Sequence, residues 1–148
     1  MGYSETLEAA GAKVLAFQEF GSYQGNWYAV VDYNGEIGVA EGSYGSCSVC
    51  DAFEAEFGCG DEPPIEKDGK YFRNNWVDDE ITKEEYDQLK SDYQTKFSNF
   101  GADYLRNISN KEMIKTRLDE ITKKTEEDGY SFYEEEKEGL EWCLTQLQ

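Results

Sequence analysis

Three cysteines within thirteen positions are the residues of this sequence best suited to chemistry. They stand in the segment "GSCSVCDAFEAEFGC" with the spacing Cys47-x2-Cys50-x8-Cys59. A Cys-x-x-Cys pair places two thiolates close together, and Zn²⁺ prefers four tetrahedral ligands with soft sulfur among them. Neighbouring glycines allow the backbone to curl so that amide groups point at the sulfur atoms. The spacing therefore predicts a metal site, with zinc as the metal.

The fourth ligand of such a site has several candidates, because the chain contains no histidine. Cys143, Asp51, Asp61 and a water molecule can each complete the coordination. Cys143 stands in "GLEWCLTQL" beside an apolar stripe, so a buried small side chain is its other interpretation. If Cys143 is a ligand, the metal ties the last helix to the cysteine segment, and metal loss loosens the whole fold.

Other roles for the three cysteines stay open. A redox pair is expected in a βαβ context, which the sequence pattern does not show. A disulfide needs an oxidising compartment, and unliganded structural thiols need none. An ion held by three or four thiolates is a poor Lewis acid, so a structural metal is expected. Without histidine or a phosphate-binding glycine motif we expect no enzyme; a Cys-dependent redox or metal-dependent enzyme is the alternative.

The elements before the cysteines are predicted to form a helix and a three-stranded antiparallel meander. Ser4 is expected to cap a short helix that Gly11 ends. Asn34-Gly35 lies between two runs of strand formers and predicts a type I′ hairpin, because both residues tolerate positive φ. Its two-residue loop places Tyr33 opposite Glu36 and Val31 opposite Gly38. The predicted strands span residues 13–20, 27–33 and 36–42.

The elements after the cysteines are predicted to be helical. One or two helical turns are expected over 51–58, and 59–76 reads as irregular, with Pro63-Pro64 and Asp68-Gly69 as turn markers. Three S/T-x-x-E capping boxes then begin three helices with apolar stripes: Thr82 with Glu85, Ser109 with Glu112, and Ser131 with Glu134. We expect these stripes to pack on one another and on one face of the sheet.

Together these elements predict one α+β domain over residues 1–148. Residues 1–60 form the helix, the meander and the cysteine segment. Residues 61–80 form an irregular connector, and residues 81–148 form the helical part.

The chain is strongly acidic. Thirty-two Asp and Glu oppose fourteen Lys and Arg, which gives a formal charge of −18. This excess argues against binding nucleic acid or an anionic membrane and favours a basic protein partner. Duplex DNA carries one charge per ~1.7 Å of axis, so −18 matches about nine base pairs. A basic groove built for nucleic acid can accept such a surface.

The acids that could contact a partner form clusters along the sequence. A solvated helix face is the other interpretation of each cluster. The start of the chain shows no basic leader with an apolar run, which predicts a cytoplasmic protein. The candidate partner-binding residues are Asp78, Asp79, Glu80, Glu134, Glu135, Glu136 and Glu138.

A resemblance in character adds to this interpretation. A very acidic, aromatic-rich chain with "GSCSVCDAFEAEFGC" and no catalytic set resembles the small phage-encoded inhibitors of bacterial defence. Among these it is similar to anti-CRISPR proteins, some of which hold a structural metal. The resemblance implies a DNA mimic that blocks DNA loading onto Cas9 in the host bacterial cytoplasm. It carries over a class of function and no individual contact residue.

Overall fold

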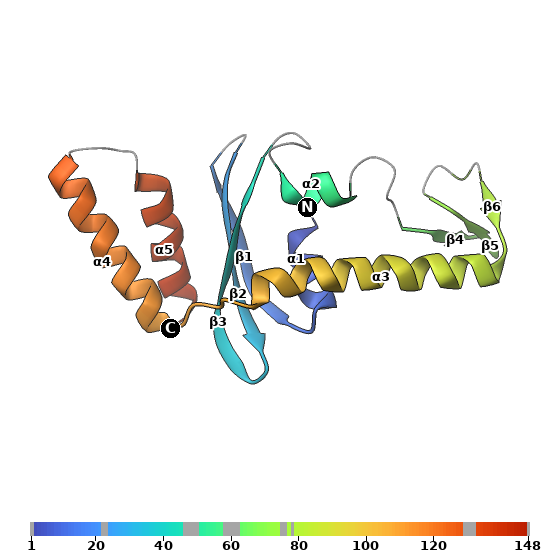
Figure 1. Ribbon diagram of the computed structural model, residues 1–148, viewed down its shortest axis with the longest axis horizontal. Helices are drawn as coiled ribbons and strands as arrows, with labels where there is room; N and C mark the ends of the chain where they lie inside the picture. Colours follow the sequence, from blue (N-terminus) through green and yellow to red (C-terminus); the bar gives the residue numbers. More distant parts are fainter. Residues whose placement is uncertain are drawn as a thin grey trace.

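The structure is a computed structural model that describes residues 2–21, 24–45, 51–57, 63–74, 77, 79–128 and 133–147, without the side chain of Glu54. It is an α+β fold, as the sequence predicts. A three-stranded antiparallel sheet stands in the middle, and helices cover both of its faces (Figure 1). A second, smaller three-stranded sheet lies at the far end of the longest helix.

The central sheet is the predicted meander. Its strands are β1 (Lys13–Gly21), β2 (Gly25–Tyr33) and β3 (Glu36–Tyr44), in that order across the sheet. Asn34 and Gly35 have φ of 54° and 82°, which matches a type I′ turn. The predicted register is confirmed, with Tyr33 opposite Glu36 and Val31 opposite Gly38.

One face of the sheet is covered by α1 (Tyr3–Ala9), α2 (Ala52–Phe57) and α3 (Lys83–Leu105) (Figure 1). This side holds an aromatic core in which Tyr3 lies 5.1 Å from Trp27, measured between ring centroids. α1 packs closely on α3 because Gly101 has no side chain: a Cβ there would collide with the backbone of Thr6. Gly2, not Ser4, occupies the N-cap position of α1.

The opposite face is covered by α4 (Lys111–Asp128) and α5 (Glu134–Gln146) (Figure 1). Their buried residues form a second core with the strands: Phe20, Tyr28, Val30, Val39, Ile114, Ile121, Leu140 and Cys143. The expectation that all C-terminal helices share one face is therefore wrong. The strands alternate side chains between two cores, so both faces of β2 need a cover.

The chain changes face between α3 and α4. Ser109 forms a bridge with Val39 of β3, with N–H···O distances of 2.8 and 2.9 Å. Ser109 is thus occupied by the sheet, and the side chain of Asn110 caps α4 by accepting from the N–H of Met113 at 2.9 Å. The predicted cap at Ser109 is wrong by one residue.

The other two predicted capping boxes have different outcomes. Thr82 and Glu85 form the complete box at the start of α3. α5 begins at Glu134 with Tyr133 in the N-cap position and no side-chain cap, so Glu134 is the first helical residue instead of the third. Ser131 lies outside the described residues.

The segment predicted as an irregular connector contains three short strands. They are β4 (Ile65–Lys67), β5 (Lys70–Phe72) and β6 (Glu80–Ile81). Asp68 and Gly69, with φ of 53° and 78°, form a second two-residue turn between β4 and β5. Tyr71 of β5 packs on Tyr86 of α3 at 4.8 Å between ring centroids, which joins this sheet to the helix.

Candidate functional site

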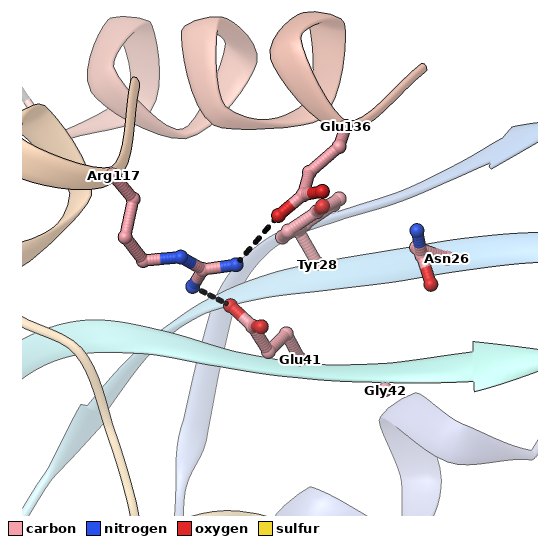
Figure 2. A pocket seen from close by; sticks show the side chains of 6 residues that line it. All are labelled: Asn26, Tyr28, Glu41, Gly42, Arg117 and Glu136. Carbon is pink, nitrogen blue, oxygen red and sulfur yellow. Dashed lines mark hydrogen bonds and ion pairs between the residues drawn. The ribbon is translucent and has the colours of Figure 1, made fainter. Parts of the chain in front are cut away.

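A charged site lies where α4 and α5 meet the central sheet. The guanidinium of Arg117 in α4 donates one hydrogen bond to Glu41 of β3 at 2.6 Å and one to Glu136 of α5 at 3.3 Å. Figure 2 shows Arg117 reaching between the two carboxylates. The hydrogen bonds that Arg117 donates, first of all the one to Glu41, raise the pKa of Arg117, so the group stays charged.

Tyr28 of β2 lies beside these charges. The residue is only 2% exposed. Its hydroxyl makes no hydrogen bond to any of the described residues, and the oxygen itself is open to the pocket. Burial raises the pKa of Tyr28 well above its ordinary value; the charges of Glu41 and Glu136 raise it further. The hydroxyl is therefore protonated and faces both carboxylates.

These side chains line an open pocket of about 290 Å³, named here the Arg117 pocket. Its lining residues, labelled in Figure 2, are Asn26, Tyr28, Glu41, Gly42, Arg117 and Glu136. They come from two strands and two helices, so the packing of α4 and α5 on the sheet creates the pocket.

Further acids lie near the same end of the sheet. Glu135 of α5 lies against the turn end of β1 and β2: its Oε1 lies 2.8 Å from where a Cβ on Gly21 would stand and 2.7 Å from one on Gly25. Burial raises the pKa of Tyr44, and the nearby charges of Glu19 and Glu135 raise it further. Glycine at both positions leaves room for the carboxylate.

The Arg117 pocket is suited to binding a cation. Glu41 and Glu136 each use one carboxylate oxygen on Arg117 in the hydrogen bonds observed, and each has a second oxygen that can accept. Two carboxylates against one guanidinium leave a formal charge of −1. An anion would meet repulsion here, whereas a donor with positive charge would meet acceptors.

The predicted metal ligands are only partly described. Cys47, Cys50, Cys59 and Asp61 lie outside the described residues. Among the residues that are described, no group of three or more His, Cys, Asp or Glu could hold a metal ion.

Cys143 is fully buried in the core between α5 and the sheet. Burial raises the pKa of its thiol to about 12. This placement matches the interpretation of Cys143 as a buried small side chain.

Asp51 is buried on the other side of the sheet and already accepts several hydrogen bonds. Its carboxylate accepts from the Tyr3 hydroxyl at 2.6 Å, from the Gly45 N–H at 3.0 Å and from the Phe53 N–H at 2.9 Å. Both oxygens are used, so Asp51 fastens the start of α2 to α1. It has the contacts of a structural residue in this arrangement.

The predicted partner-binding acids lie at opposite ends of the molecule (Figure 1). Glu134, Glu135, Glu136 and Glu138 belong to α5, and Glu136 lines the Arg117 pocket. Asp79 and Glu80 lie at the small sheet, where Asp79 pairs with Arg73 at 2.8 Å. Asp78 lies outside the described residues. The structure does not bring the two clusters together.

Sequence reasoning missed most of the Arg117 pocket. Glu41 and Tyr28 fall within predicted strands and Asn26 directly before one, but nothing in their spacing marks them. Arg117 lies 76 positions from Glu41. The signal available was the unbroken apolar run Trp27–Val31, which is typical of a strand covered on both faces. Such a run predicts that helices cover both faces of this strand, including the face on which Tyr28 lies.

No protein family, curated protein or solved structure matches this chain. None of the helices in the described ranges is long and apolar enough to cross a membrane.

Proposed function

We propose that this protein is a non-enzymatic acidic binding protein that occupies a basic, nucleic-acid-handling surface of another protein and inhibits it. The observation that carries the proposal is the formal charge of −18 on 148 residues. A partner that handles nucleic acid presents the matching positive surface, and the attraction speeds association at low salt.

The uneven distribution of charge supports the α5 end of the molecule as the binding end. α4 carries six acidic and five basic residues, so its own charges nearly balance. α5 carries five acidic residues and one lysine, Lys137, and the meander carries four acidic residues and one lysine, Lys13. Of these three parts, α5 therefore has the largest excess of negative charge.

Within this class, we propose an anti-CRISPR protein that blocks DNA loading onto Cas9 by mimicking DNA, acting in the host bacterial cytoplasm. The support is the resemblance in character described above. A structural zinc held by Cys47, Cys50 and Cys59 belongs to the same proposal; its support is the Cys-x2-Cys-x8-Cys spacing.

A binding assay with defined partners tests the function. The purified protein is titrated into a Cas9 with its guide RNA and into unrelated basic nucleic-acid-binding proteins, at low and high ionic strength. We expect a complex that weakens steeply with salt and that prevents the partner from binding duplex DNA. A complete lack of binding to every basic partner at low salt contradicts the proposal.

A matched pair of double variants locates the binding end. Glu134→Gln with Glu135→Gln removes two charges from α5, and Asp79→Asn with Glu80→Gln removes two from the small sheet. We expect the first pair to weaken binding at least severalfold more than the second. Equal weakening by both pairs would show that only total charge matters and would contradict a binding surface at α5.

A further inference from the structure

We propose that the Arg117 pocket is a socket for one guanidinium side chain that a partner protein inserts between Glu41 and Glu136. That the guanidinium comes from a protein rests on the function proposed above; that the pocket takes a guanidinium group rests on its own geometry. Three observations carry it: the charges of the lining, an unused hydroxyl, and the fixed shape of the walls.

The charges favour a cation over an anion or a neutral ligand. Arg117 contacts one oxygen of Glu41 and one of Glu136. The second oxygen of each carboxylate can accept from a new donor, and a planar guanidinium offers five N–H donors in a fixed fork. A second guanidinium brings the formal charge of the pocket from −1 to zero. The two guanidinium groups and the two carboxylates then alternate in the pocket.

The hydroxyl of Tyr28 is an independent sign of a missing partner. It belongs to a residue that is buried as a whole and lines the pocket, its oxygen is open to the pocket, and it has no hydrogen-bond partner among the described residues. An incoming N–H can donate to its oxygen, because a protonated hydroxyl retains lone pairs. A ligand would therefore give this hydroxyl a hydrogen-bond partner that the described fold does not supply.

The walls hold Tyr28 in place. Gly139 of α5 lies directly against its ring, and a Cβ at Gly139 would overlap the ring. The pocket of about 290 Å³ thus has one wall whose side chain is held in place, and room for one side-chain head group. Asn26 at its edge adds an amide that can donate or accept.

The test uses the full chain and a small probe, N-acetyl-L-arginine amide. The probe is titrated into ¹⁵N-labelled protein and followed by the backbone amide signals. We expect saturable millimolar binding, with the largest shifts at Glu41, Gly42 and Glu136. The citrulline analogue has the same shape without charge, and we expect it to bind at least tenfold more weakly.

Tyr28→Phe is the decisive variant, because it removes a hydroxyl that bonds to nothing in the described fold. We expect unchanged or higher thermal stability and about tenfold weaker probe binding, the effect of one lost hydrogen bond to a charged group. Glu41→Gln should weaken the probe as well. Glu138→Gln is the matched control, since Glu138 is an exposed acid of α5 outside the pocket, and it should leave the affinity unchanged.

Each contrary result overturns the socket. Equal affinity for the citrulline analogue and the arginine probe would mean that the pocket takes a neutral polar ligand and does not recognise the charge. Equal affinity in Tyr28→Phe, or equal weakening in Glu138→Gln, would mean diffuse attraction to the acidic surface, and absence of saturable shifts would mean no site. If the probe binds as expected but no basic protein does, the proposed function fails and the guanidinium site stands. If a basic protein binds while the probe does not, the socket fails alone.

Discussion

Arg117 of α4 and Glu41 of β3 are joined by a hydrogen-bonded ion pair of 2.6 Å across 76 positions of sequence. The pair links the helical layer to the edge strand of the sheet. About a third of each side chain is exposed, so solvent screens the interaction only in part. Through Glu136 the same guanidinium also holds α5.

Replacing Arg117 should therefore lower the stability of the fold. Arg117→Gln leaves Glu41 and Glu136 facing each other without a cation. We expect a loss of about 1–2 kcal/mol in the free energy of unfolding, below the full value for two buried charged hydrogen bonds because of solvent screening. Urea denaturation followed by circular dichroism measures it.

Arg106→Gln is the control for this measurement. Arg106, the C-cap residue of α3, pairs with Asp103 of that helix at 3.4 Å, and its side chain is 76% exposed. We expect a change within about 0.5 kcal/mol, as for most surface substitutions. If the two arginine variants lose equal stability, the Arg117 ion pairs do not hold the layers together.

Asp51→Asn should destabilise the protein without removing zinc. The new amide nitrogen would face an N–H donor, either that of Gly45 or that of Phe53, where the carboxylate accepted both. We expect a cost of about 1–3 kcal/mol for the lost hydrogen bond and the clash of donors. Thermal unfolding together with zinc content per chain checks it. A variant of normal stability that has lost its zinc would instead identify Asp51 as a metal ligand.

The cysteine variants separate a structural metal from a reactive thiol. We expect about one zinc per chain in the purified protein, and Cys47→Ser, Cys50→Ser and Cys59→Ser should each lose zinc and stability together. Cys143→Ala should keep its zinc, because Cys143 lies in the core between α5 and the sheet, while Asp51 and Gly45 lie on the α1 side of the sheet. Elemental analysis and thermal unfolding measure both quantities. Metal-free protein of unchanged stability would disprove the zinc site.

Stability should fall at alkaline pH because of buried tyrosines. Burial raises the pKa of Tyr3 and of Tyr28 well above the ordinary value of 10.0. A raised pKa of an acid means that the folded state favours the neutral form. Its contribution is complete below pH 10.0 and is lost progressively as the pH rises above it, toward the folded-state pKa.

Absorbance at 295 nm during an alkaline titration follows this ionisation. We expect exposed tyrosines to ionise near their ordinary pKa and a second group to ionise together with unfolding. Tyr28→Phe should remove part of the second step and shift unfolding to higher pH. A single ionisation step without unfolding would contradict the burial of these hydroxyls.

Local patterns in the sequence predicted the local structure well. Asn34-Gly35 specified the turn and, through its two-residue loop, the register of β2 and β3. Asp68-Gly69 carries the same signal, and its strands were overlooked because they are only three residues long. Thr82 and Glu85 predicted the start of α3 because a capping box depends on four neighbouring residues alone.

The arrangement of the helices was not predictable by the same means. An apolar stripe shows that one face of a helix is buried but does not identify the surface that buries it. Ser109 pairs with Val39, a residue far from it in sequence, at the point where the chain crosses to the other side of the sheet. This contact decides which face of the sheet α4 and α5 cover. The Arg117 pocket depends on this crossing, because Arg117 and Glu136 both follow it.

The bridge between Ser109 and Val39 also affects how the molecule meets its own copies. An outer strand normally leaves a row of unpaired backbone groups that can template pairing with another chain, which leads to aggregation. Here Ser109, between α3 and α4, forms hydrogen bonds with both the amide and the carbonyl of Val39 in the middle of β3. A neighbouring copy therefore finds no continuous ladder along β3, which protects this edge of the sheet against pairing with another copy.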